Sequence, residues 1–376
     1  MDSVERFEGL GVTVLQGAAR FTGPREVAVN DTRVGARRIV IATGSSPFVP
    51  PIPGLESVPY LTNETVFDVT ELPRHVIVVG GGPIGCELGQ AFRLLGARVS
   101  LLEMARLLPK DDPELVAILR NRLRADGMAL YEGAKVVAAA KAGGGVTIEI
   151  ERDGTRESLE GSALLLAAGR APGLEDLGLE AAGIDRDRLG LKLDARLRTS
   201  NPRVYAAGDA AGSLQFTHMA GYHAGIVIKN ALFRWPAKVE TSAVPWVTYT
   251  APELAHVGLT EAEARAAHGR VNILRWPFAE NDRAQAERHL AGMVKAITRP
   301  NGRILGASIV GAHAGELIQS WVLAISQGLK VGALAQMIAP YPTLGEANKR
   351  AAGSFYVPKL FGPRTKWLVR QLARLG

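Results

Sequence analysis

A glycine-rich turn between an apolar strand and a helix constrains the fold of this chain more than any other feature. Residues 75–79 are rich in β-branched side chains, the turn spans residues 80–85, and residues 84–95 carry apolar side chains at helical spacing. Residues 98–102 form a second apolar segment. Two strands joined by one such helix must run parallel, which predicts an α/β fold with a doubly wound, Rossmann-like domain.

The turn itself has the G-x-G-x-x-G spacing of a dinucleotide-binding loop. In this pattern Gly80 makes the tight turn, Gly82 lets the backbone approach a pyrophosphate, and Gly85 lets the helix pack close to the strand. The anion binds the free N–H groups of the first helical turn, where Pro83 and Ile84 stand. A structural glycine turn is the alternative, because glycine is frequent in this chain. The position between strand and helix favours dinucleotide binding.

Glu103 ends the second apolar segment, roughly 20 residues beyond the glycine loop. A carboxylate there accepts hydrogen bonds from a ribose 2′-hydroxyl group and repels a 2′-phosphate, so the sequence predicts NAD(H) in preference to NADP(H). Arg98 and Arg106 are close in sequence and could soften that preference. Solvated charges that flank the helix and strand are the simpler interpretation of both.

Other parts of the chain predict further strands and helices. Short strands are expected before the first linker, and the Pro-rich stretch 47–59 is interpreted as a connection to a new unit. From about residue 241 the pattern favours a separate α+β unit. The expected strands are 12–15, 26–29, 38–42, 146–150, 293–297 and 304–310, with strand-to-glycine segments at 163–169 and 204–209, a turn at Asp153-Gly154 and helices at 260–267 and 316–327.

The composition excludes several classes of function. The only cysteine is Cys86, so no disulfide, two-cysteine redox centre or cysteine-rich metal site can form within the chain, and no metal is expected. The net charge is +7, but basic and acidic residues alternate along most of the chain, which argues against a nucleic-acid partner. A charged beginning and the lack of a long apolar run predict a cytoplasmic protein.

The end of the chain, residues 358–376, concentrates positive charge without acids. Its spacing suits a basic amphipathic helix that contacts a membrane surface. The interpretation we favour is a solvated terminal helix that packs one face on its own protein. The alternating side chains are Leu360, Phe361, Trp367, Leu368, Leu372 and Leu375 with Arg364, Lys366, Arg370 and Arg374.

Five motifs in this order resemble the pyridine nucleotide-disulfide oxidoreductase family, which includes dihydrolipoamide dehydrogenase, glutathione reductase and mercuric reductase. The motifs are residues 39–47, 80–87, 168–172, 204–209 and 342–346, and the resemblance extends to about Tyr356. It implies an incomplete second nucleotide domain and a C-terminal α+β dimerisation domain beside the Rossmann-like domain. The implied boundaries are 1–70 with 192–243 for FAD binding, 71–191 for NAD binding, 244–357 for dimerisation and 358–376 for the tail.

The resemblance also implies FAD as a second cofactor. Thr43, Gly44 and Asp209 are then the flavin-side residues, with Asp209 bonding toward the sugar-alcohol chain, and Gly169 joins the cofactor-binding set. For Asp209 alone, an Asx-type turn is the alternative. Glu87 is implied to lie near the nicotinamide, and if it is buried and unpaired, desolvation should raise its pKa above the ordinary value.

Two departures from the family pattern limit what can be carried over. The sequence begins downstream of the family's first nucleotide module and its C-x-x-x-x-C pair, so we expect a shortened chain with incomplete FAD binding and no dithiol for disulfide exchange. Tyr341-Pro342 stands where relatives carry the acid-base His-Pro, and Glu346 matches the glutamate that orients it. A phenol that titrates near 10 is a poor proton shuttle, so Tyr341 is either a structural residue or a substrate contact.

These observations predict a homodimeric FAD-dependent oxidoreductase that transfers hydride between NADH and flavin and passes electrons to a small-molecule acceptor. Glu87, Tyr341 and Glu346 are the candidate catalytic residues, and the loop from Tyr341 to Glu346 is expected to reach the partner subunit's flavin site. A non-catalytic protein for NAD binding and dimerisation is the second hypothesis. One part of a split flavoenzyme is the third.

Overall fold

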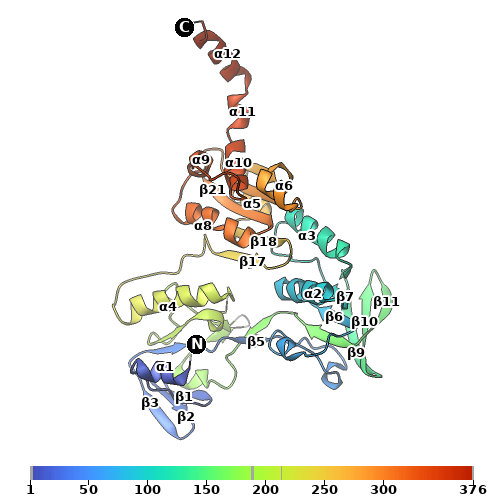
Figure 1. Cartoon of the computed structure of the whole chain (residues 1–376). Helices are drawn as coiled ribbons and strands as arrows, with labels where there is room; N and C mark the ends of the chain where they lie inside the picture. Colours follow the sequence, from blue (N-terminus) through green and yellow to red (C-terminus); the bar gives the residue numbers. More distant parts are fainter. Residues whose placement is uncertain (1–2, 188–189, 213, 375–376) are drawn as a thin grey trace. The chain divides into compact units, whose positions relative to one another are not determined.

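The computed structural model describes residues 3–187, 190–212 and 214–374 (Figure 1). Its internal contacts divide the chain into two compact units. Unit 1 comprises Met1–Ser46 and Arg170–Glu240, and unit 2 comprises Pro47–Gly169 and Thr241–Gly376. Each unit therefore combines segments that are far apart in the sequence.

The first part of unit 2 contains a four-stranded parallel sheet with the order β12-β6-β7-β8. All five residues of β6 are buried, as expected for a strand whose sheet is covered on both faces. The predicted parallel strand-helix-strand unit and the α/β fold are confirmed. The bounds are β6 His75–Val79, α2 Pro83–Leu95, β7 Arg98–Glu103, α3 Pro113–Ala125, β8 Ala129–Glu132 and β12 Ala163–Leu166.

The two faces of this sheet are covered by different structures. Helices α2 and α3 cover one face, where Leu101 and Val78 pack against Leu119. An antiparallel sheet of β9 (Lys135–Ala142), β10 (Gly145–Arg152) and β11 (Thr155–Gly161) covers the other through Ile148 and Ile150. The predicted Asp153-Gly154 turn joins β10 to β11, with both residues at positive φ, as tight hairpins require.

The second part of unit 2 is an antiparallel sheet with the order β17-β18-β21-β20-β19. Its core gathers around Trp321 and Phe278, which are fully buried. The strands are β17 Pro245–Thr248, β18 Glu253–Gly258, β19 Asn272–Pro277, β20 Met293–Thr298 and β21 Ile304–Gly311. The helices are α5 Glu261–His268, α6 Asp282–Glu287, α7 Ala314–Leu317, α8 Gln319–Ser326, α9 Val331–Gln336, α10 Glu346–Ser354, α11 Val357–Leu360 and α12 Pro363–Leu372.

Unit 1 is built mainly of short strands around a core of Phe21, Ile41, Leu174 and Val204. Strands β1 to β3 form an antiparallel sheet, while β4 pairs in parallel with β16. The bounds are α1 Val4–Gly9, β1 Ala19–Gly23, β2 Glu26–Val29, β3 Thr32–Gly35, β4 Ile39–Ile41, β5 Ser45–Pro47, β13 Arg170–Pro172, β14 Arg186–Asp187, β15 Gly190–Leu191, β16 Val204–Ala206 and α4 Thr217–Ala231. Short 3-10 helices in unit 1 are η3 Leu179–Ala182 and η4 Gly208–Ala211, and those in unit 2 are η1 Leu55–Ser57, η2 Val66–Asp68 and η5 Phe278–Glu280.

Two secondary-structure predictions were wrong. Residues 12–15 form no strand, and Val12 and Leu15 are exposed, so their alternating pattern does not mark a buried face. The single helix expected at 316–327 is divided at Ile318 into α7 and α8. At this break the Trp321 amide donates to the Ile318 carbonyl oxygen at 2.9 Å, and the side-chain amide of Asn348 donates to the carbonyl oxygen of Leu317 at 2.8 Å.

The packing also differs from the expected domain boundaries. Leu55 and Val58, assigned to the FAD-binding remnant, pack against Ile77 of β6 in unit 2. Leu174 and Leu179, assigned to the NAD-binding domain, pack in the core of unit 1. Apolar contact rather than sequence position therefore decides where the linker segments 47–70 and 170–191 belong. The assignment of the units to FAD and NAD stays a prediction.

Candidate functional site

Two of the loop glycines are required by the protein's own packing. Gly80 has φ +116°, and a Cβ atom on it would overlap the carbonyl oxygen of Ala167. A Cβ atom on Gly85 would overlap the carbonyl oxygen of Gly80. Strand β6 and helix α2 can therefore approach each other only because these two positions lack side chains.

Gly82 is different, because nothing in the protein requires a glycine there. Its φ is −76°, which any residue can adopt, and a Cβ atom would meet no atom within 4 Å. Gly82 is the N-cap of α2, no side chain caps the helix, and Pro83 occupies the first helical position. The first amides of α2 have no acceptor within the helix, and the position of a Gly82 Cβ atom beside them is open, so this helix end fits an anion at close range.

Glu103 lies beside this loop at the end of β7. Its Oε2 accepts a hydrogen bond from the Gly81 amide at 2.7 Å, and Oε1 accepts one from the Ala105 amide at 2.8 Å. The carboxylate is thus fixed next to the glycine turn, with lone pairs left for a ligand hydroxyl. Arg98 begins β7 and Glu103 ends it, so at about 3.3 Å per residue their Cα atoms lie roughly 16 Å apart, at opposite ends of the strand.

Glu87 stands one turn further along α2 and is half-buried. Burial raises the pKa of this carboxyl above its ordinary value, and the hydrogen bond from the Tyr249 amide, 2.8 Å from Oε1, works in the opposite direction. The direction of the shift is the one predicted. The carboxylate is not unpaired, however, because the chain just after β17 supplies the Tyr249 N–H group.

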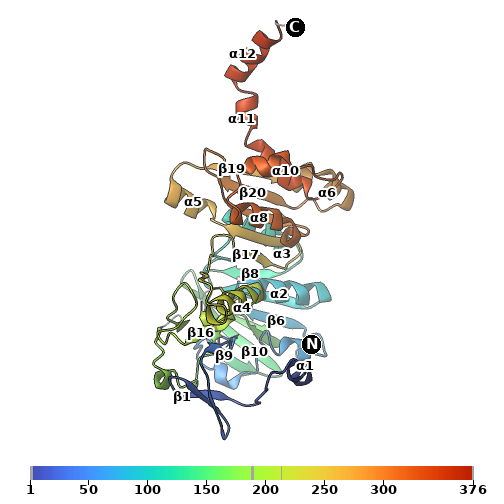
Figure 2. The ribbon, with the colours of Figure 1, turned by 90° about the vertical axis from the view of Figure 1, so that its left-hand side faces the viewer.

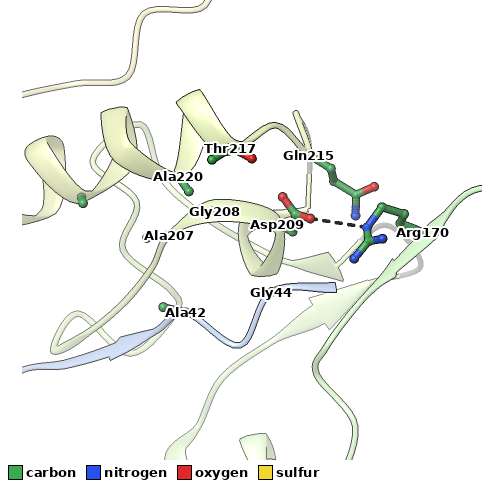
Figure 3. Close-up of a pocket in the computed structure, with 10 residues that line it drawn as sticks. Ala42, Gly44, Arg170, Ala207, Gly208, Asp209, Gln215, Thr217 and Ala220 are labelled. Carbon is green, nitrogen blue, oxygen red and sulfur yellow. Dashed lines mark ion pairs between the residues drawn. The ribbon is translucent and has the colours of Figure 1, made fainter. Parts of the chain in front are cut away.

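Unit 1 contains a cavity of about 490 Å³ at the carboxyl ends of β4 and β16 (Figure 3). The cavity is open because most of its walls are small residues, and α4 contributes three of them at spacings of three and four residues on one face. Gly208 has φ +64°, and a Cβ atom there would lie 3.1 Å from the Ala220 Cβ atom. The lining residues are Ala42, Gly44, Arg170, Ala207, Gly208, Asp209, Gln215, Thr217, Ala220 and Ala224.

Asp209 is the acidic group of this cavity and is held by two neighbours. The Ser45 hydroxyl donates to Asp209 Oδ2 at 2.5 Å, and Arg170 Nε lies 3.7 Å from the same oxygen. Arg170 in turn donates from Nε to Ser45 Oγ and from Nη2 to the Ser45 carbonyl oxygen, both at 2.6 Å. Figure 3 shows the Asp209 and Arg170 side chains directed toward each other beside Gln215. The arrangement provides an oriented acceptor for a hydroxyl-rich ligand.

The structure separates the predicted flavin-side residues. Gly44 and Asp209 line the cavity, but Thr43 uses its hydroxyl to bond the Gly173 carbonyl oxygen at 2.6 Å and is not part of the wall. Gly169, at φ +124°, accepts from the Phe48 amide at 2.9 Å in unit 2. Sequence reasoning missed Gln215 and the wall of α4, although Thr217, Ala220 and Ala224 repeat small residues at helical spacing, which is a detectable signal.

The loop before α10 carries the remaining candidates. Tyr341 precedes a cis peptide bond to Pro342, is 70% exposed, and donates its hydroxyl to Asp282 Oδ2 at 2.9 Å. That hydrogen bond and the charges of Asp282 and Glu346 raise the pKa of the phenol above its ordinary value. Glu346 begins α10 and lies 4.0 Å from Arg350. The phenol is therefore a hydrogen-bond donor at neutral pH and not a base.

A parallel sheet with a glycine loop and an acidic strand end places the first part of unit 2 in the Rossmann-like class of α/β folds. Residues 3–224 match the family described as pyridine nucleotide-disulphide oxidoreductase, and residues 244–352 match the dimerisation domain of the same family. The chain belongs to the pyridine nucleotide-disulphide oxidoreductase family. Members of this family depend on FAD and a pyridine nucleotide.

Similar proteins include enzymes with different substrates. A dihydrolipoyl dehydrogenase of Thermus scotoductus is 39% identical over 93% of this chain and 76% of its own length. A mercuric reductase of Bacillus cereus is 35% identical over 94% of this chain, which spans only 56% of that relative. The solved HOCl-induced flavoprotein disulfide reductase of Escherichia coli superimposes with a TM-score of 0.84 at 29% identity, covering 93% of this chain and 82% of that one.

Proposed function

We propose that this chain binds NADH at the glycine loop and FAD at the cavity of unit 1, and that it supports hydride transfer between them. When bound, the flavin supplies a two-electron acceptor for the hydride of the nicotinamide, and a small-molecule oxidant then receives the electrons. Two features of the same chain carry this proposal. Helix α2 has no side-chain cap, and the position of a Cβ atom on its N-cap residue Gly82 is open; the cavity of unit 1 is lined mostly by small residues and contains Asp209.

At the first site the protein's role is to bind and orient. The amides of the first turn of α2 bind the pyrophosphate, and Glu103 accepts hydrogen bonds from the adenosine ribose. Because the Gly81 and Ala105 amides already fix that carboxylate, little conformational entropy is lost when the sugar binds. A 2′-phosphate would meet a negative charge, so we propose a preference for NADH. Glu87 lies on the same helix, and we assign it to the nicotinamide end.

At the second site Asp209 receives hydrogen bonds from the polyhydroxyl chain of the flavin. Ser45 and Arg170 hold its carboxylate in one orientation, and the volume of the cavity falls within the usual range of roughly 300–1,000 Å³ for small-molecule sites. Small walls at Ala220 and Gly208 leave room for a flat ring. The residues present therefore fit the cofactor that the family implies.

Tyr341 and Glu346 are proposed to act at the acceptor site of a homodimer. The matched dimerisation domain supports two-fold assembly, and an exposed Tyr341 is available to a partner subunit. Because the pKa of its phenol is raised, Tyr341 would keep its proton and, by exchanging the hydrogen bond to Asp282, would donate one to the acceptor rather than remove a proton. Glu346 would keep that donor protonated through its negative charge.

We further propose that electrons do not pass through a dithiol of this chain. Cys86 is its single cysteine, and it is completely buried in α2. Burial and the nearby carboxylates raise the pKa of its thiol to about 12, so the reactive thiolate is almost absent at neutral pH. Cys86 is a packing residue.

The decisive experiment compares flavin absorbance before and after NADH is added to the FAD-loaded protein without oxygen. We expect bleaching in the wild type and in Gly144→Val, whose Cβ position is also open but lies in the β9–β10 turn. Gly82→Val should fold equally well, retain flavin and fail to bleach, because only the pyrophosphate needs that space. A colourless protein that still binds NADH would instead favour the non-catalytic hypothesis.

A further inference from the structure

Helices α11 and α12 form a basic tail, residues 357–374, that follows the last matched residue of the dimerisation domain, 352. Figures 1 and 2 both show these helices extending away from α10 and from the antiparallel sheet of unit 2. Neither helix contains a buried residue. Its exposed apolar side chains, each between 50% and 67% accessible, are Leu360, Phe361, Trp367, Leu368, Val369 and Leu372.

This geometry decides between the two interpretations of the sequence. We favoured a terminal helix that packs one face on its own protein, and that interpretation is wrong for the described residues 357–374. The alternative, an exposed basic amphipathic helix, agrees with the structure. Leu375, which we included in the pattern, lies outside the described residues.

The side chains of α12 and the residues just after it separate by chemistry. Lys366, Arg370 and Arg374 follow one another at four-residue spacing and therefore share a face. Leu368 and Leu372 share another face by the same rule. Lys359 and Arg364 add two further cations, and no acidic residue follows Glu346. Leu368 and Leu372 thus lie opposite the cationic face, Arg364 and Trp367 lie at the border between the two faces, and no acidic side chain compensates the positive charge.

We propose that the basic tail docks on the surface of an anionic lipid bilayer. A lipid surface satisfies both faces at once, because the apolar face enters the acyl boundary while the cations meet lipid phosphates and carboxylates. No helix among residues 3–187, 190–212 and 214–374 is long and apolar enough to cross a membrane, so the tail lies on the surface.

Charge argues against a second copy of this chain as the occupant of the tail. The chain carries a net charge of +7, and every copy presents the same acid-free tail. Two tails that approach each other would bring cations together without counter-charges. An anionic bilayer offers the opposite charge in excess, and each Lys or Arg near such a surface adds an independent increment to binding.

The test is sedimentation of the full-length protein with vesicles of phosphatidylcholine and phosphatidylserine, and with vesicles of phosphatidylcholine alone. We expect binding to the mixed vesicles, weakening with salt, and little binding to the neutral ones. K366E/R370E/R374E should bind the mixed vesicles at least about tenfold more weakly, since three cations are reversed. W367A/L368A should weaken binding several-fold through loss of apolar insertion.

K135E/K141E/R270E is the matched control, because it makes the same charge change at exposed positions of unit 2 outside the tail. It should bind within about twofold of the wild type. If the control and the tail variant lose vesicle binding to the same extent, the proposal is wrong. It is also wrong if the wild type binds neutral vesicles as strongly as the mixed vesicles. If the tail variants change only the particle mass in light scattering, a second copy covers the tail and the proposal is wrong.

Discussion

The ammonium group of Lys295 lies 2.8 Å from Oδ2 of Asp112, and both side chains are almost completely excluded from solvent. Lys295 is on β20, whereas Asp112 caps α3 by accepting from the Glu114 amide at 3.0 Å. Glu114 and Glu261 also lie 2.8 Å from the same ammonium group. Burial alone would lower the pKa of Lys295, but hydrogen bonds to three carboxylates outweigh burial and raise it. A buried ion cluster thus joins the two parts of unit 2.

Replacing Lys295 with Met should destabilise the protein by about 3 kcal/mol or more, because Asp112 would remain buried without its counter-charge. Urea unfolding at pH 7 gives the change in the free energy of unfolding. Arg270→Met, which removes an exposed cation from the same unit, should change it by less than about 0.5 kcal/mol. Equal effects of the two substitutions would show that the cluster contributes nothing specific.

The same cluster predicts how stability depends on pH. The hydrogen bond from Arg275, with help from Lys295, lowers the pKa of Glu114 to about 2 in the folded protein. A glutamate in the unfolded chain titrates at about 4.3. The contribution of Glu114 to the free energy of unfolding is therefore complete above that pH and is lost as the pH falls through about 2. When the free energy of unfolding is measured as a function of pH across this range, its slope should be smaller in Glu114→Gln and in Arg275→Met than in the wild type. If both variants keep the wild-type dependence of stability on pH, the pKa of Glu114 is not lowered by these contacts.

The sequence was most informative where structure is local. Residues 75–103 were predicted correctly because their apolar spacing, glycines and turn act within one strand-helix-strand unit. The break at Ile318 could not be predicted, since the contact that Asn348 makes there comes from a distant helix. The packing of segments 47–70 and 170–191 has the same origin, because contacts with residues far away in the sequence determine where these segments pack.

The candidate site shows the same limit. One motif predicts that Glu103 lies beside the glycine loop, because spacing along the chain fixes that arrangement, and the structure places its carboxylate against Gly81. The wall of the unit 1 cavity brings β4, β16 and α4 together, and only Gly44 and Asp209 were predicted among its residues. The hydroxyl of Thr43 bonds the Gly173 carbonyl oxygen, a contact that a sequence pattern does not reveal.

Helix α2 offers a test of why its glycines are needed. Gly85→Ala should destabilise the protein by about 2 kcal/mol or more, because the new methyl group would overlap the rigid carbonyl oxygen of Gly80. Gly89→Ala is the matched control in the same buried helix, where the methyl group meets the flexible end of Met128 at 3.0 Å. Thermal unfolding should therefore show a large loss only for Gly85→Ala. A loss of similar size in Gly89→Ala would mean that any methyl group on this helix face is harmful.

Glu103→Gln tests whether the acidic strand end selects the cofactor. The amide keeps the size of the side chain but removes the negative charge that would repel a 2′-phosphate, so NADPH should bind relatively better. We expect the ratio of the dissociation constants for NADPH and NADH to fall by about tenfold or more, equivalent to about 1.4 kcal/mol. The amide of Gln can accept only one of the two hydrogen bonds that Glu103 accepts from the Gly81 and Ala105 amides, so the substitution could weaken the binding of both coenzymes. The ratio of the two dissociation constants is unaffected by such a general weakening. If both constants rise together and their ratio is unchanged, Glu103 only supports the loop and does not recognise the sugar.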